Sequence, residues 1–142
     1  MIRLSKMADY SFVLLNQMLS KAGASWSAAD LAEATGLPLP TVAKLMKLMG
    51  KMEILTAQRG AAGGYRLAKD PAVVTVADII EAVDGPISLT QCVNEHEPDC
   101  AVQNFCGMRG GWDKMNAAVK QALSTVTLKD MAQPVDASRR VA

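Results

Sequence analysis

The chain has 142 residues; half of them are hydrophobic, a fifth are charged, and the net charge is +1. This composition can bury a core, which excludes an intrinsically disordered chain and predicts one compact domain, with or without an appendage. No apolar run reaches the roughly 18 residues that span a bilayer. Arg3 and Lys6 lead into an amphipathic helix instead of a signal-peptide core, so we expect a cytoplasmic protein.

The charges are unevenly divided along the chain. Residues 1–75 hold nine Lys and Arg against five Asp and Glu, a net charge of +4, whereas residues 76–142 hold six against nine, a net charge of −3. A basic half suits a polyanion such as nucleic acid, although a solvated basic face explains the imbalance almost as well.

Two helices are predicted first. Apolar residues at helical spacing predict a core helix from Ser5 to about Ala22. Ser27 and Asp30 have the spacing of a capping box, which predicts the start of a short second helix that runs through Ala34. Gly36 then ends this helix.

A third helix is predicted from Thr41 to about Lys51, with Pro38 and Pro40 in its first turn, where their missing N–H groups cost no helical hydrogen bond. One face is apolar and the opposite face is basic. The apolar face holds Leu45, Leu48 and Met49, and the basic face holds Lys44, Lys47 and Lys51.

A hairpin and two further helices are predicted next. Residues 54–59 and 65–67 are expected to form two short strands joined by the glycine-rich segment 60–64. Thr75 caps a helix that Gly85 ends. Residues 89–110 show little periodicity. A long final helix follows, and its apolar stripe comprises Trp112, Met115, Ala118, Val119, Ala122, Leu123 and Val126.

The second and third helices have the spacing of a helix-turn-helix, in which the small Ala32 allows a close crossing and Gly36 makes the turn. The third helix would then be the recognition helix, with Thr41, Ala43 and Lys44 near base edges and Lys47 near phosphate. Since this spacing occurs in many unrelated helix pairs, an ordinary three-helix core with solvated lysines remains open.

The hairpin would form the wing of a winged helix. Its tip of Gly and Ala residues can approach the DNA backbone or the minor groove closely, with Arg59 and Arg66 at the base of the hairpin. No enzymatic site is evident: no His neighbours a nucleophile, and residues 60–64 lack the Gly-Lys-Ser/Thr ending of a phosphate loop.

Three cysteines, Cys92, Cys100 and Cys106, lie within fifteen residues, and the chain has no others. A reducing cytosol would keep them as thiols. Soft sulfur ligands favour an iron–sulfur cluster or zinc, and three thiolates leave one ligand position for nitrogen or oxygen. Two alternatives stay open: a zinc site completed by His96, and inert or oxidisable thiols.

Three segments together resemble the IscR/NsrR-type family of iron–sulfur regulators: residues 2–10, residues 59–65 of the wing, and the cysteine triplet. The resemblance extends over residues 2–132. Within the family, residues 37–44 and 82–87 look most like the regulators of SUF iron–sulfur assembly operons.

The resemblance implies a homodimer whose long C-terminal helices cross, with a [2Fe–2S] or [4Fe–4S] cluster on each protomer. Cys92, Cys100 and Cys106 match the cluster cysteines of the family. The residues expected to contact DNA are Arg3, Lys6, Thr41, Lys44, Lys47, Arg59, Gly63, Tyr65 and Arg66.

The fourth cluster ligand does not carry over directly. IscR-like members have a histidine three residues after the last cysteine, but Arg109 stands there and stays protonated, so it cannot bind iron. NsrR-like members use an aspartate from the partner's first helix, which Asp9 matches and which we favour. His96 is a second candidate; Glu95, Glu97, Asp99, water and a small thiol are others.

These observations predict a mainly α fold: a winged helix-turn-helix domain at residues 1–85, a cluster-binding loop at 86–110, a dimerisation helix at 111–132 and a disordered tail at 133–142. The expected function is a cluster-sensing regulator, as a repressor of SUF genes, that binds palindromic operator DNA. The alternatives are an iron–sulfur carrier or redox protein and a cluster-free regulator with zinc or thiols.

Overall fold

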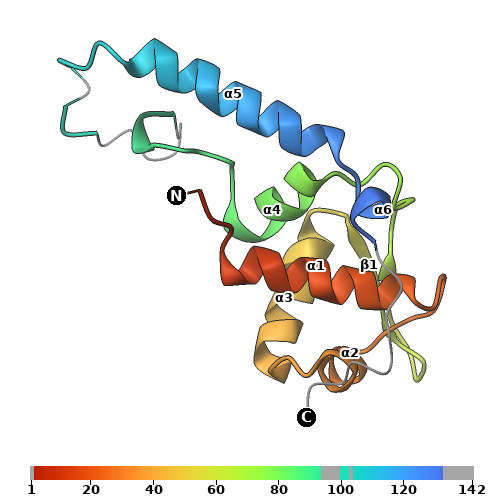
Figure 1. Ribbon diagram of the computed structural model, residues 1–142. Coiled ribbons are helices and arrows are strands. Elements are labelled where there is room, and N and C mark those ends of the chain that lie inside the picture. The colour runs from red at the N-terminus through yellow and green to blue at the C-terminus, as the bar shows by residue number, and fades with distance from the viewer. Residues whose placement is uncertain (1, 94–99, 103, 133–142) are drawn as a thin grey trace.

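The computed structural model describes residues 2–93, 100–102 and 104–132. Figure 1 shows a body built from the first four helices and a hairpin, with one long helix projecting from it. In chain order the elements are α1 (Lys6–Leu19), α2 (Ala28–Thr35), α3 (Leu39–Lys51), β1 (Leu55–Gln58), β2 (Gly64–Leu67), α4 (Val76–Asp84), the 3-10 turn η1 (Gln91–Val93), α5 (Arg109–Thr125) and α6 (Leu128–Met131). The mainly α winged-helix fold is confirmed.

Local capping sets the ends of the first two helices. The Ser5 hydroxyl accepts a hydrogen bond from the Ala8 N–H and caps α1. This helix ends at Leu19, earlier than Ala22, because the Ser20 hydroxyl donates to the Gln17 carbonyl and closes the last turn. The predicted Ser27 capping box and the left-handed Gly36, with φ of 73°, are both confirmed for α2.

Helix α3 has the two faces that its sequence predicts. It begins at Leu39, between the two prolines, and its apolar face enters the core. The buried residues are Val42, Leu45, Met46 and Met49, while Leu48 is half-buried. Lys44, Lys47 and Lys51 are all exposed on the other side. The basic face of the helix is therefore free to meet a ligand.

The hairpin is fastened to the body by a contact that the sequence did not indicate. Strands β1 and β2 pair antiparallel, with Leu55 opposite Leu67 and Gln58 opposite Gly64. Trp26 then pairs with Tyr65 as an isolated bridge, and their two N–H···O bonds measure 2.8 and 2.7 Å. A Cβ at Gly64 would lie 2.5 Å from the Trp26 carbonyl oxygen, so this close approach requires glycine.

One apolar core joins α1, α2, α3, α4 and the start of the hairpin. Its largest fully buried side chains include Leu14, Leu31, Leu45, Met49 and Ile79. Leu128 of α6 also lies in this core and is only 1% exposed, although it follows the long helix in sequence. The last helix is therefore part of the N-terminal body.

The predicted single helix over residues 111–132 is wrong in its extent, because α5 ends at Thr125. Val126 is extended, its carbonyl accepts the Val76 N–H at 2.9 Å, and the Leu128 N–H donates to the Val74 carbonyl at 2.8 Å. A capping box of Thr127 and Asp130 then starts α6. The chain leaves helical geometry because this pairing ties it back to the body.

Helix α5 packs on α4 and on η1 along a half-buried stripe of Trp112, Asn116, Val119 and Leu123. The other apolar residues of the predicted stripe are exposed: Met115, Ala118, Ala122 and Val126. Within the described ranges, no helix is both long enough and apolar enough to cross a membrane. The predicted tail at 133–142 lies outside the described residues.

Candidate DNA-binding surface and cysteine segment

The helix-turn-helix residues predicted to read DNA lie together on α3. Ala43, Lys44 and Lys47 are exposed on the face that points away from the core, and Thr41 is half-buried at the start of the helix. Helix α2 packs across α3, with Ala32 half-buried against the core where a small side chain was expected. The geometry suits insertion of α3 into a major groove, while the role of each residue stays a prediction.

The wing tip is shaped by its glycines. A Cβ at Gly63 would lie 2.7 Å from both the Gln58 and the Gly60 carbonyl oxygens, so a larger residue cannot occupy this turn without a backbone shift. Arg59 is exposed directly after β1. Gly63 thus has a conformational reason to be glycine, which is compatible with the predicted close approach to DNA.

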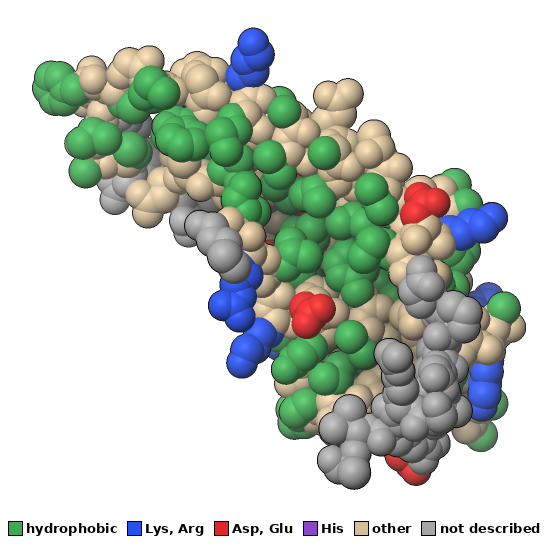
Figure 2. All heavy atoms as spheres, viewed as in Figure 1, with side chains coloured by type: hydrophobic (Ala, Val, Ile, Leu, Met, Phe, Trp, Pro, Cys, Tyr) green, Lys and Arg blue, Asp and Glu red, His purple; other side chains and the backbone are tan. Residues whose placement is uncertain are grey.

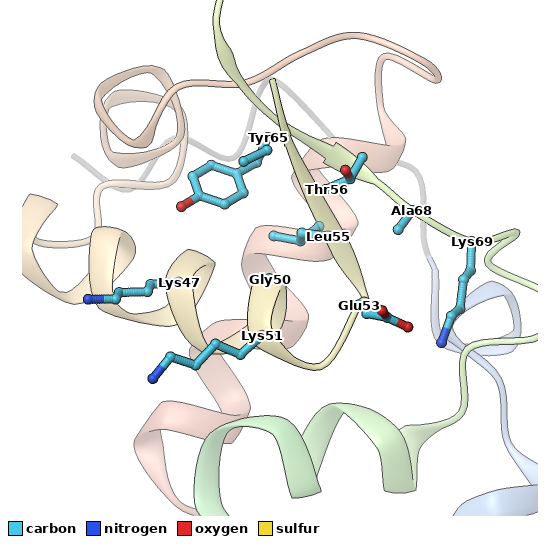
Figure 3. A pocket seen from close by; sticks show the side chains of 10 residues that line it. Lys47, Gly50, Lys51, Glu53, Leu55, Thr56, Tyr65, Ala68 and Lys69 are labelled. Carbon is cyan, nitrogen blue, oxygen red and sulfur yellow. The ribbon is translucent and has the colours of Figure 1, made fainter. Parts of the chain in front are cut away.

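Tyr65 and Arg66 lie on opposite faces of the hairpin, as neighbours in a strand must. Tyr65 faces α3 and lines a cavity between that helix and the wing (Figure 3). Arg66 instead lines a smaller cavity beside the end of α1, with Met18 and Ala22. The structure therefore does not bring Arg59, Tyr65 and Arg66 together on one contact face.

The first turn of α1 and the segment just before it carry three predicted site residues. Arg3 and Lys6 are exposed, and so is Asp9, the predicted ligand to a partner's cluster. Ser5, between them, donates from its hydroxyl to the Asp84 carboxylate at 2.8 Å and fastens this end of α1 to α4. Asp9 is thus held on a fixed helix and is free to face another subunit.

The three cysteines are free and half-buried. Cys92 belongs to η1, and its sulfur lies 3.2 Å from the Thr90 hydroxyl. Across the part of the chain that the structure describes, no three His, Cys, Asp or Glu side chains lie close enough together to hold a metal ion. The alternative ligands Glu95, His96, Glu97 and Asp99 fall outside the described residues.

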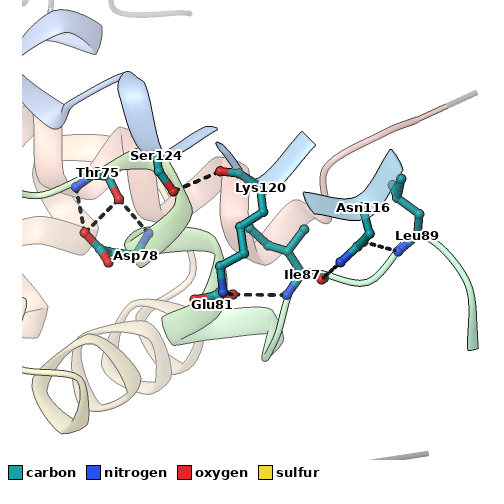
Figure 4. A network of polar contacts seen from close by, with 8 residues as sticks. All are labelled: Thr75, Asp78, Glu81, Ile87, Leu89, Asn116, Lys120 and Ser124. Carbon is teal, nitrogen blue, oxygen red and sulfur yellow. Dashed lines mark hydrogen bonds and ion pairs between the residues drawn. The ribbon is translucent and has the colours of Figure 1, made fainter. Parts of the chain in front are cut away.

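Sequence reasoning missed a polar clamp that holds the segment before Cys92 (Figure 4). The Asn116 side-chain amide donates to the Ile87 carbonyl and accepts the Leu89 N–H, both at 3.0 Å. The Glu81 carboxylate of α4 accepts the Lys120 ammonium at 2.7 Å and the Ile87 N–H at 3.3 Å. A polar residue within the apolar stripe of a helix is the signal that could have identified Asn116.

Known proteins resemble this chain over nearly its full length. The Rrf2 family model, described as an iron-dependent transcriptional regulator, matches residues 4–134. The regulator CymR of Bacillus subtilis is 27% identical over 136 residues, which cover 95% of this chain and 93% of CymR. The regulator NsrR of Bacillus licheniformis is 24% identical over 141 residues, which cover 99% of each protein.

Solved structures agree with this assignment. The structure of CymR, the global cysteine regulator of B. subtilis, has a TM-score of 0.71 at 28% identity and covers 96% of this chain and all of that one. An IscR from T. potens has a TM-score of 0.68 at 23% identity over 99% of this chain and 93% of its own, which supports the fold alone. The named relatives are transcription regulators, not enzymes. The chain belongs to the Rrf2 family of transcriptional regulators and is a DNA-binding regulator with a winged helix.

Proposed function

We propose that the protein is an iron–sulfur cluster-sensing repressor of SUF assembly genes that binds palindromic operator DNA as a homodimer and has no catalytic activity. The observation that carries this proposal is the set of three free, half-buried thiols that directly follows a winged helix. The similarity of residues 37–44 and 82–87 to SUF regulators supports the choice of target genes.

The donor set has the chemistry that a cluster needs. Cys92, Cys100 and Cys106 are soft ligands, none of them is consumed in a disulfide, and their segment is only half-buried. They would hold the group, with Asp9 of the partner subunit as the favoured fourth ligand. When bound, the group would supply chemistry that responds to iron and oxidants. Binding requires the three thiols to come closer together than they lie in the described segments.

The exposed side of α5 supports the homodimer. Met115 is 44% exposed, and Ala118 and Ala122 continue an apolar and small-residue face along the helix, which the exposed Val126 follows directly. Figure 2 shows hydrophobic side chains gathered along this helix and onto the adjoining body. A second copy of α5 would cover this face. Such a dimer would present two copies of α3 to half-sites about one helical turn apart.

The chain has a route by which the cysteine segment could influence DNA binding. Asn116 and Glu81 fix residues 87–89 to α5 and α4. Helix α4 packs on α3, and α6 ties the end of α5 into the same core. An altered position of the segment would therefore shift α5, the dimer contact and the spacing of the recognition helices.

The test is operator binding by protein purified without oxygen, alongside iron, sulfide and zinc analysis of the same sample. We expect iron and sulfide in the wild type, and a large loss of both, with altered operator affinity, in the triple Cys→Ser variant. Asp9→Ala should make the cluster more labile, whereas Asp113→Ala on α5 serves as the matched control. If the wild type and the triple Cys→Ser variant bind a SUF promoter with equal affinity, the sensing proposal is wrong.

The cluster-free regulator is the second candidate, because the described cysteines are not gathered into a metal-binding group. It predicts a colourless protein that either contains zinc or contains no metal. The Cys→Ser variants would then bind the operator like the wild type under reducing conditions. An iron–sulfur carrier would instead transfer its cluster and show no preference for operator sequence.

A further inference from the structure

A cavity of about 560 Å³ lies between α3 and the wing. Gly50, Leu55 and Tyr65 line it, and the Tyr65 ring sits so close to α3 that a Cβ at Gly50 would lie 3.4 Å from it. The remaining lining residues are Lys47, Lys51, Glu53, Thr56, Ala57, Ala68 and Lys69. The cavity thus adjoins both elements that a winged helix uses to contact DNA.

The charge of this cavity is predominantly positive. Lys47, Lys51 and Lys69 line it against a single carboxylate, Glu53. All three lysines are exposed. In the described ranges, the one ion pair between side chains joins Lys120 and Glu81, so none of these ammonium groups forms an ion pair with a carboxylate of a described residue. The cavity therefore attracts an anion.

The lysines diverge instead of converging. In Figure 3, Lys47 and Lys51 project to one side from α3, while Lys69 lies toward the opposite end, beyond Glu53. A small anion is bound best where several donors point at one position. Lysines spaced along an open cavity instead suit a chain of separate negative charges, although Glu53 disfavours a phosphate at its own position. The arrangement favours a polyanion over a free ion.

The position of the cavity identifies the polyanion. Lys47 and Lys51 lie on the same exposed face of α3 as Lys44, one turn and two turns along the helix. We propose that the cavity is a groove for the DNA backbone, in which Lys51 and Lys69 contact phosphates beyond the predicted reach of the recognition helix and the wing tip. This inference rests on the DNA-binding part of the proposed function and adds residues that extend its footprint.

The test is the salt dependence of operator binding by the full-length protein with Lys51→Gln, Lys69→Gln and the double variant. The binding constant K falls as the salt concentration rises, and each lost phosphate contact should make the slope of log K against log salt less steep by about 0.9. Raising the salt from 50 to 200 mM should therefore weaken binding by about threefold less for each contact removed. Preference for the operator over a scrambled duplex should not change, because phosphate contacts carry no sequence information. Lys114→Gln on α5 is the charge-matched control.

The outcomes separate this inference from the function on which it rests. If Lys47→Gln lowers the slope but Lys51→Gln and Lys69→Gln do not, the groove assignment is wrong and DNA binding stands. If the wild type shows no salt-dependent binding to duplex DNA, the DNA-binding function itself fails. If inorganic phosphate at constant ionic strength displaces DNA from the wild type but not from the double variant, the cavity holds a free anion and the backbone assignment is overturned.

Discussion

The two halves of the chain differ sharply in how they are held together. Helices α1 to α4, the hairpin and α6 share one core with many fully buried side chains. Among the described residues from 83 to 127, by contrast, none is buried, and this range includes all of α5. The first half can fold on its own apolar surface, whereas the second half depends on a partner surface or a bound group.

In the second half, polar contacts supplement apolar side chains that are only partly buried. Asn116 and Lys120 hold α5 to the segment at 87–89 and to α4, and Val126 is paired with the body by a backbone hydrogen bond. Such contacts orient a helix but each stabilises it by only about 0.5–1.5 kcal/mol. This difference suits a regulator in which a rigid DNA-binding unit carries a segment that can respond to a signal.

The largest expected effect tests whether α6 belongs to the core that α1 to α4 share. Leu128→Ala should lower the free energy of unfolding by about 2–5 kcal/mol, because it opens a cavity in the shared core. Urea unfolding measures this change. Lys129→Ala, at the exposed neighbouring position on α6, should change the stability by less than about 0.5 kcal/mol. Equal effects of the two variants would place Leu128 outside the core.

A Gly→Ala substitution should lower the stability of the protein in the first half and raise it in the second. Gly64→Ala should destabilise the protein by about 1–3 kcal/mol, because the new methyl group collides with the Trp26 carbonyl and separates the wing from the body. Gly110→Ala meets no atom within 4 Å on α5 and should stabilise the helix by about 0.5–1 kcal/mol. Thermal melts and operator binding report both changes; a stable Gly64→Ala wing with full affinity would contradict the Trp26 anchor.

The polar clamp should matter both to stability and to the cysteine segment. Asn116→Leu leaves the Ile87 carbonyl and the Leu89 N–H without partners and should cost about 1–2 kcal/mol. Alkylation of Cys92 should also become faster relative to Cys106 in the same molecule. Gln121→Leu, an exposed position on α5, is the matched control. Unchanged alkylation rates would show that the clamp does not position Cys92.

The smallest effect concerns two capping carboxylates. Hydrogen bonds from the Ser27 side chain and backbone lower the pKa of Asp30, and those from the Thr127 backbone and side chain lower the pKa of Asp130, both from an ordinary value of 3.8. Because the folded-state pKa is lowered, their stabilisation is present above pH 3.8 and is lost as the pH falls through the folded value. Asp30→Asn and Asp130→Asn should therefore lower the urea midpoint at pH 7, and the difference should vanish at low pH.

Much of the DNA-binding half could be predicted because its signals are local. Ser27, Gly36 and Thr75 set helix ends through contacts three or four residues away, and the apolar spacing of α3 identifies its buried face. The winged-helix class follows from these elements in order. Of the residues of α3 predicted to contact DNA, Lys44 and Lys47 are exposed and Thr41 is half-buried, and their roles stay predictions.

Long-range pairings could not be read from the sequence. Nothing local indicates that Trp26 bridges Tyr65, that Arg66 lies beside the end of α1, or that Asn116 binds the backbone 29 and 27 residues before it. The predicted end of the long helix was wrong partly for this reason, since Val126 and Leu128 pair with Val76 and Val74. The capping box of Thr127 and Asp130 is, by contrast, a local signal in the sequence that marks the start of a new helix.

The sequence by itself determined the helix caps, the basic face of α3, the glycine-rich wing and the three thiols, because each of these depends on neighbouring residues or on side-chain chemistry alone. Only the tertiary structure decided that Leu128 returns to the first core, that α5 keeps an apolar face exposed, and that Lys51 and Lys69 line one cavity with Tyr65. These features join residues far apart in the chain, and packing, not local preference, fixes which of them meet.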